Sequence, residues 1–181
     1  MQRLIATTDG ARPKDLRDRA ILLLLAVYAL RSGEVRTLKL EDLDWEKGLL
    51  FVPRHKGRKR EPYPLSPTVG QAIIRYLKEG RPRSSYREVF LTVEAPIQPL
   101  RKSSLGAIVA KRTLSLDPPV ECRGPHALRH ANATYLLAQG LSLKEIGDHL
   151  GQRLPKTTAV YAKVNLTGLR EVATLSLGGL L

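Results

Sequence analysis

The longest apolar stretch of the chain, residues 20–30, limits the folds that this sequence can adopt. It follows a charged segment that begins at Lys14, so the pattern over residues 15–30 predicts a helix buried in a core. The stretch is too short to span a bilayer, and it lies too far inside the chain for an ordinary signal peptide. With 181 residues, the chain is long enough to bury one core of this kind and short for two.

The segments on either side of this helix have a different character. Residues 1–13 mix polar and apolar side chains around Gly10, which is typical of a linker. After the helix, Ser32 is expected to cap a second short helix that runs to Leu38. Residues 42–65 then predict a small antiparallel sheet, and the second turn of this sheet is rich in Lys and Arg.

The remainder of the sequence predicts helices with little extended structure. The patterns indicate helices over residues 66–78 and 103–113, and a brief extended piece over residues 89–92. Four more helices are expected to begin near Pro125, Ser142, Pro155 and Thr167. The sequence contains no internal repeat and no second domain boundary. The expected fold class is α+β and mostly α-helical, with residues 14–181 as one domain.

Basic side chains outnumber acidic ones, with 30 Lys and Arg against 17 Asp and Glu and a net charge of +13. Such an excess favours a polyanionic partner, because each cation placed near a phosphate releases condensed counterions. This ranks nucleic acid ahead of an anionic membrane surface and of a basic protein without such a partner. The single cysteine, Cys122, excludes an internal disulfide, and the set of Cys and His pairs that a zinc site needs is missing. We therefore expect a cytoplasmic protein that needs no metal and does not bind a membrane.

Residues 124–130, Gly-Pro-His-Ala-Leu-Arg-His, are the densest candidate site. Pro125 suits the first position of a helix, which places His126 and Arg129 three residues apart on one face. The backbone N–H groups at the start of a helix attract phosphate oxygens, and an Arg can bind those oxygens with two hydrogen bonds. A His at the same place can accept a proton. The alternative interpretation is a capped helix with a core His and a surface Arg.

Further candidates lie on both sides of this helix. Arg31 and Glu34 have the spacing of a structural ion pair, and the same carboxylate would also fix a guanidinium that points at an anion. Lys56 lies in the basic turn, where it could donate a proton to a departing oxygen. Tyr161 is one of six tyrosines, and by itself it would be assigned to a core or an interface. The residues expected to contact DNA are Arg54, Arg58, Lys59, Arg60 and His130.

Taken together and in order, four segments resemble the tyrosine recombinase (phage integrase) family. Residues 30–34, Leu-Arg-Ser-Gly-Glu, resemble its first arginine box, and residues 55–61 resemble its lysine-bearing turn. Residues 125–130 contain its H-x-x-R box. The Leu-Gly-Gln of residues 150–152 and the Thr-Thr-Ala-Val-Tyr of residues 157–161 resemble its final box and nucleophile. Each box is weak alone, and the resemblance rests on their order and separation along nearly the whole chain.

The resemblance implies the tyrosine-recombinase catalytic fold and strand transfer in double-stranded DNA without a cofactor. Tyr161 would attack the scissile phosphate, forming a 3′-phosphotyrosyl link and releasing a 5′-hydroxyl end. Arg31 and Arg129 would neutralise the non-bridging oxygens as charge develops. His126 would assist removal of the tyrosine proton, and Lys56 would protonate the leaving oxygen.

The sequence departs from the family pattern in two places. Gln152 stands where the family usually has His or Trp, and its amide can donate a hydrogen bond but does not titrate. This predicts weakened cleavage rather than none. Family members also carry a separate N-terminal helical domain, whereas this sequence begins in the predicted linker, so we expect the catalytic domain alone. The apolar residues 175–181 are expected either to dock into a neighbouring subunit of a tetramer on DNA or to fold onto their own core.

Two rival functions share most of these residues. One is a type IB topoisomerase, which relaxes supercoils through the same covalent intermediate. The other is a DNA-binding module that keeps the fold but has lost catalysis. The sequence does not identify the bases that are recognised, nor whether the natural reaction is integration, excision, transposition or multimer resolution.

Overall fold

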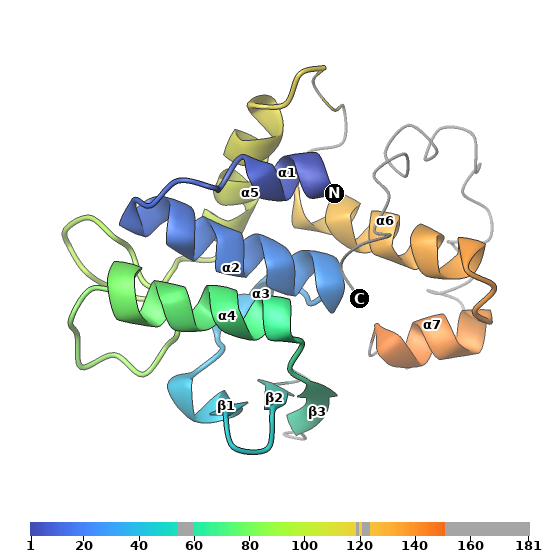
Figure 1. Cartoon of the computed structure of the whole chain (residues 1–181), viewed down its shortest axis with the longest axis horizontal. Coiled ribbons are helices and arrows are strands. Elements are labelled where there is room, and N and C mark those ends of the chain that lie inside the picture. The colour runs from blue at the N-terminus through green and yellow to red at the C-terminus, as the bar shows by residue number, and fades with distance from the viewer. Residues whose placement is uncertain (54–59, 119, 121–123, 151–181) are drawn as a thin grey trace.

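The fold is given by a computed structural model of the chain, which describes residues 1–53, 60–118, 120 and 124–150. Within these residues, helices surround one central helix, and a small sheet lies at an edge of the molecule (Figure 1). The helices are α1 (Gln2–Ala6), α2 (Pro13–Val27), α3 (Ser32–Arg36), α4 (Pro67–Arg75), α5 (Ser104–Leu114), α6 (Pro125–Ala138) and α7 (Leu143–His149). The strands are β1 (Leu43–Asp44), β2 (Leu49–Pro53) and β3 (Arg60–Pro64). The predicted mostly helical α+β class is confirmed.

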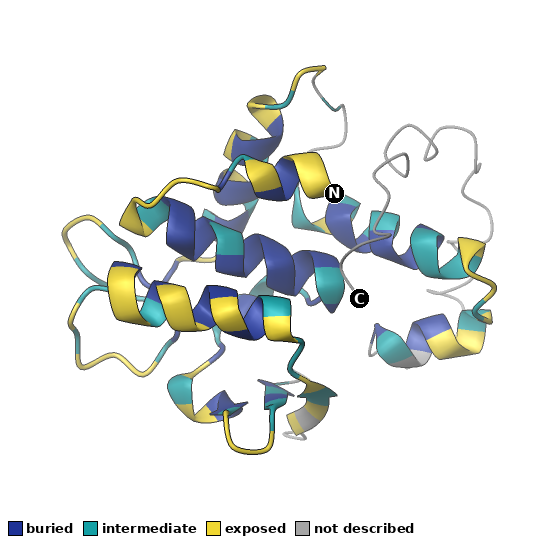
Figure 2. Cartoon of the chain, viewed as in Figure 1, coloured by how far each residue is buried: buried dark blue, intermediate teal, exposed yellow. Residues whose placement is uncertain are grey.

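Helix α2 forms the centre of the core. Its residues 20–26 are each at most 2% exposed, so the helix is buried on every side rather than along one stripe. Helices α1, α4, α5 and α6 pack against it, and Figure 2 shows it dark blue along most of its length. The helix ends at Val27, earlier than the predicted residue 30, because Ala29 has a φ of +49° that an α-helix cannot contain.

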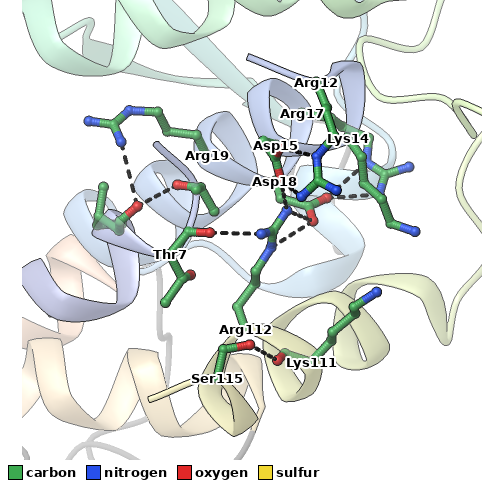
Figure 3. Close-up of polar contacts among 12 residues, drawn as sticks. Thr7, Arg12, Lys14, Asp15, Arg17, Asp18, Arg19, Lys111, Arg112 and Ser115 are labelled. Atoms are coloured by element: carbon green, nitrogen blue, oxygen red, sulfur yellow. Dashed lines mark hydrogen bonds and ion pairs between the residues drawn. The ribbon is translucent and has the colours of Figure 1, made fainter. Parts of the chain in front are cut away.

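The charged start of α2 is also buried, and an arginine from α5 neutralises it. Arg112 Nη2 lies 2.7 Å from Asp15 Oδ1 and 2.8 Å from Asp18 Oδ2, while Arg112 Nη1 donates to the carbonyl of Thr7 at 2.8 Å. Arg17 pairs with the other oxygen of Asp18 at 2.8 Å. Figure 3 shows Arg112 reaching from α5 to these partners. Buried carboxylates are costly unless they are paired, so this network fastens α5 and the segment after α1 to α2.

The first residues of the chain fold onto the core, so the prediction of a linker over residues 1–13 is wrong for residues 1–8. Leu4 and Ile5 of α1 are 2% and 6% exposed, and Thr8 is fully buried. A helix of five residues does not form through propensity alone, so burial and the hydrogen bond from Arg112 to Thr7 hold it. This stabilisation is tertiary and leaves no periodic pattern in so short a stretch.

The sheet predicted at residues 42–65 is confirmed, with β2 between two antiparallel neighbours. Leu50 of β2 pairs with Leu43 of β1 on one side and with Tyr63 of β3 on the other. Leu50 and Val52 are fully buried, because alternate residues of a strand face the same side. Strand β2 ends at Pro53 and β3 begins at Arg60, so the basic turn falls between them, and residues 54–59 lie outside the described residues.

The later helices follow the predictions closely. Helices α4 and α5 correspond to the helices expected over residues 66–78 and 103–113, although a π-type turn at Tyr76–Gly80 replaces the end of the first. Helix α6 begins at Pro125, and α7 begins directly after Ser142. The helices expected near Pro155 and Thr167 lie outside the described residues.

The extended piece predicted over residues 89–92 packs in the core rather than joining the sheet. Val89, Phe90 and Leu91 are fully buried, and Phe90 stacks on Tyr76 with 5.6 Å between ring centroids. A single bridge pairs Leu91 with Pro99. This segment therefore contributes apolar contacts without extending the sheet.

Helices α6 and α7 form a second, smaller apolar cluster. Its buried members are Ala29, Ala133, Ile146 and Leu150. Leu128 at the start of α6 belongs to the main cluster, so α6 contacts both. In the part of the chain that the structure describes, no helix is both long enough and apolar enough to cross a membrane.

Candidate active site

Arg31 lies at the junction of α2 and α3, where one carboxylate holds both its backbone and its side chain. The buried Glu34, 1% exposed, accepts a hydrogen bond from the Arg31 backbone N–H at 2.8 Å and pairs with Arg31 Nη1 at 2.9 Å. Arg31, rather than the predicted Ser32, therefore occupies the N-cap of α3, and the helix ends at Arg36 instead of Leu38. Because the Arg31 side chain is 41% exposed, Glu34 orients a guanidinium that an anion can reach.

Arg129 lies in the second turn of α6 and is only 6% exposed, which excludes the alternative of a surface arginine. Its Nη1 donates to the carbonyl of Ala29, and its Nη2 donates to the carbonyl of Leu150 at 2.6 Å. The left-handed conformation of Ala29 costs about 1–2 kcal/mol, and the bond from Arg129 helps to hold it. One guanidinium thus ties the turn before Arg31 to the end of α7.

Asn132 repeats this arrangement one turn further along α6. Its Nδ2 donates to the carbonyl of Ala26 at 2.8 Å, and the residue is 5% exposed. The last carbonyls of an α-helix have no partner within the helix, so Asn132 supplies a donor at the end of α2, and Arg129 supplies one just beyond it. The sequence analysis missed Asn132, although its spacing of three from Arg129 places both residues on one helix face.

The two histidines of the box differ in exposure. Gly124, with a φ of +141°, and Pro125 at the first helical position begin α6 as the sequence predicts. His126 follows in the first turn and is exposed, which excludes a core histidine, and His130 is half-buried one turn later. Burial lowers the pKa of His130 below its ordinary value, and electrostatic interactions with His126 and Arg129 lower it further. His130 is therefore mainly neutral at pH 7.

Arg60 is the one member of the predicted DNA-contacting group in the basic turn that lies within the described residues. Its Nη1 lies 3.0 Å from Oδ1 of Asp42, whose side chain is 2% exposed. The contact is an ion pair rather than a well-aligned hydrogen bond. The other Asp42 oxygen accepts the backbone N–H of Lys39 at 2.9 Å. Asp42 thus anchors Arg60 at the start of β3, and about half of the Arg60 side chain stays exposed.

The structure brings two of the predicted residues, Arg31 and Arg129, to one end of α2, and it places His126 in the first turn of α6. Arg31 follows Ala29 by two residues, Arg129 holds the Ala29 carbonyl, and His126 lies one turn before Arg129. The two guanidinium groups supply positive charge, so this end of α2 suits a phosphate. The other predicted residues lie outside the described residues; these are Arg54, Lys56, Arg58, Lys59, Gln152 and Tyr161.

Among the residues that the structure describes, no three side chains of His, Cys, Asp or Glu gather closely enough to hold a metal ion.

Proteins of similar sequence carry recombinase names. The putative integrase/recombinase y4rA of Sinorhizobium fredii is 45% identical over 177 residues, which cover 96% of this chain and 42% of that protein. The putative integrase/recombinase y4gC of the same organism is 41% identical, covering 94% of this chain and 88% of that protein. Tyrosine recombinase XerA of Pyrococcus horikoshii is 37% identical, and the match covers 94% of this chain and 57% of that protein. The chain thus spans less than half of the first of these relatives and most of the second.

Solved structures and a family model agree with these relatives. A crystal structure of XerA recombinase has a TM-score of 0.76 at 26% identity, covering 96% of this chain and 61% of that chain. The XerH site-specific recombinase bound to its palindromic difH substrate has the same TM-score at 21% identity, and the match covers 96% of this chain and 50% of that chain. At this identity, the likeness supports the fold alone. The model of the phage integrase family matches residues 1–167. The chain therefore belongs to the phage integrase family of tyrosine recombinases.

Proposed function

We propose that this chain is the catalytic domain of a site-specific DNA recombinase that cuts and rejoins strands through a 3′-phosphotyrosyl intermediate. The observation that carries the proposal is the pair of arginines at the end of α2. Glu34 orients Arg31, and two backbone carbonyls fix Arg129. Donors that are already in place stabilise charge in a transition state without reorganising during the reaction.

The proposed reaction is a transesterification. The Tyr161 oxygen forms a bond to phosphorus while the bond from phosphorus to the 5′-oxygen breaks. Arg31 and Arg129 neutralise the non-bridging oxygens, His126 takes the tyrosine proton, and Lys56 donates a proton to the leaving 5′-oxygen. Attack by a 5′-hydroxyl on the phosphotyrosine reverses the step and rejoins a strand. The roles of Lys56 and Tyr161 come from the family resemblance.

The proposed partner is double-stranded DNA. The net charge of +13 supports this, and the XerH recombinase, which has the same fold, is bound to its difH substrate in the solved structure. We also propose that residues 175–181 link subunits into a tetramer on DNA, and that the protein acts in the cytoplasm. If deletion of residues 175–181 leaves association on DNA unchanged, the proposed tetramer contact is wrong.

We also place α1 in the catalytic domain, because Leu4 and Ile5 pack in the core of that domain.

A nicked duplex tests the proposed reaction directly. Its target site is first selected from random duplexes by binding to the chain, because the sequence does not supply it. Cleavage next to the nick releases a short strand and traps a covalent protein–DNA adduct, which is resolved by denaturing electrophoresis. Tyr161→Phe should abolish the adduct, and Tyr86→Phe at an exposed tyrosine should leave it unchanged. An adduct that persists in Tyr161→Phe would contradict the assignment of the nucleophile.

Gln152 favours a second candidate, a DNA-binding module of the same fold with weakened catalysis. If the usual His or Trp contributes one charge-assisted hydrogen bond, its loss costs about 1–2 kcal/mol, roughly a ten- to thirtyfold lower rate. Gln152→His should therefore speed adduct formation by about this factor, and an unchanged rate would refute this explanation. Binding of the selected site without any adduct would support the module. Relaxation of a supercoiled plasmid without strand exchange would instead support a topoisomerase.

A further inference from the structure

Two neighbouring carbonyls at the end of α7 are held by side chains from two other elements. Tyr63 of β3 donates its hydroxyl to the carbonyl of His149 at 3.0 Å. Arg129 of α6 donates Nη2 to the carbonyl of Leu150 at 2.6 Å. Terminal carbonyls of a helix need partners from outside it, so these two donors determine where the end of α7 lies.

Tyr63 is itself held in place. Its backbone pairs with Leu50 in the sheet, and its ring meets the ring of Tyr28 edge-on at 5.8 Å. The hydroxyl of Tyr28 donates to the carbonyl of Pro64 at 2.7 Å and accepts the backbone N–H of Ser66 at 2.8 Å. These contacts fix the end of β3 against the end of α2.

The ring of Tyr63 also meets α7 directly. The Tyr63 and His149 rings lie edge-on with 6.4 Å between their centroids. The residue therefore contacts α7 through both an aromatic ring and a hydroxyl, and only the hydroxyl is removed by substitution with phenylalanine. Tyr63→Phe therefore tests the hydrogen bond separately from the packing of the ring.

We propose that Tyr63 is a positioning residue for strand cleavage, which acts on Arg129 through the end of α7; this inference rests on the proposed function. The hydroxyl of Tyr63 fixes the His149 carbonyl, and the adjacent Leu150 carbonyl is one of the two that hold the Arg129 guanidinium. Without the hydroxyl, the end of α7 moves relative to the sheet, and the Leu150 carbonyl no longer holds Arg129 in one place. Tyr63 itself does not touch the reacting phosphate.

The chain offers a matched control. The hydroxyl of Tyr76 accepts the backbone N–H of Leu91 at 3.3 Å in the main core. Tyr76→Phe therefore loses one hydrogen bond to a backbone group, as Tyr63→Phe does, but away from α7 and Arg129. Equal effects of the two substitutions would indicate a general loss of stability rather than positioning.

Amide hydrogen exchange tests the first step without DNA or activity. The Leu150 N–H bonds to the carbonyl of Ile146 at 2.9 Å and reports on the last turn of α7. Loss of one hydrogen bond at this turn should raise its exchange rate about two- to tenfold in Tyr63→Phe, with no change in Tyr76→Phe. An exchange rate equal to that of the parent would overturn the proposal.

The nicked duplex tests the second step. Tyr63→Phe should lower the rate of adduct formation at saturating protein about two- to tenfold, while the dissociation constant for the same DNA stays unchanged. Tyr76→Phe should leave both quantities as in the parent. If the parent forms an adduct and Tyr63→Phe forms it equally fast, the proposal is wrong. If the parent forms none, the proposed function fails, and the exchange measurement still decides whether Tyr63 holds α7.

Discussion

Replacing Arg112 with methionine would measure how far the buried charge network stabilises the fold. The substitution leaves Asp15 and Asp18, whose side chains are each 2% exposed, without the partner that they share. Removing one member of a buried ion pair costs about 3–5 kcal/mol. Asp15 keeps its ion pair with Arg12, and Asp18 keeps its ion pair with Arg17. We therefore expect the lower end of this range, about 3 kcal/mol.

The loss should also depend on pH. The hydrogen bond from Arg12 lowers the pKa of Asp15, and Arg112 lowers it further against the opposing effect of burial. A carboxyl with a lowered pKa stabilises the fold fully above its unfolded-state pKa of about 3.9, and this contribution is lost as the pH falls through the lowered value. The difference in the free energy of unfolding between the parent and Arg112→Met should therefore be complete at pH 7, and it should narrow below a pH of about 4.

Urea unfolding measures both effects. With a slope of about 2 kcal/mol per M, a loss of 3 kcal/mol lowers the midpoint by about 1.5 M. Lys111→Met, at the exposed neighbouring position of α5, should change the midpoint by no more than about 0.25 M. A shift in Arg112→Met no larger than in this control would refute the reasoning. So would a difference between parent and variant that stays constant down to pH 3.

Three other substitutions each test a single contact. Glu34→Gln removes the charge that orients Arg31, so adduct formation at saturating protein should slow about tenfold; an unchanged rate would contradict the orienting role. Arg129→Lys replaces a guanidinium that bonds to two carbonyls with a single ammonium group. It should lower both the rate of adduct formation and the thermal midpoint of unfolding. Full retention of either value would argue against the two-carbonyl contact. Ser66→Ala removes the oxygen that caps α4 by accepting the Val69 N–H at 3.3 Å. Its free energy of unfolding should fall by about 1 kcal/mol in urea titrations, and an unchanged value would exclude the cap.

The sequence predicts the elements of the fold better than their ends. The apolar residues 20–30 indicate a buried helix, and α2 is one. Its end at Val27 depends on the left-handed conformation of Ala29, and an alanine gives no local signal for that conformation. The hydrogen bond that helps to hold it comes from Arg129, 100 residues away. Likewise, α1 exists because Leu4 and its neighbours meet the core, which a five-residue pattern does not reveal.

The site was predictable where helix spacing decides the geometry. The box at residues 125–130 predicts His126 and Arg129 on one face of a helix, and α6 begins where the sequence indicates. The burial of Arg129 and its carbonyl partners depends on which elements pack against α6, and helix spacing carries no information about that. The hydrogen bond from Tyr63 to His149 joins residues 86 apart for the same reason.

The separate apolar cluster of α6 and α7 has a consequence for motion at the site. In the described part of the chain, this cluster is much smaller than the one around α2. Local opening free energies follow the apolar contacts that are broken, so α7 should detach from α6 at a lower cost than global unfolding. Such an event removes the Leu150 carbonyl from Arg129 while the helices around α2 stay folded. The fraction of molecules with a competent arginine is then set by a local equilibrium, and a thermal midpoint of the whole domain does not measure it.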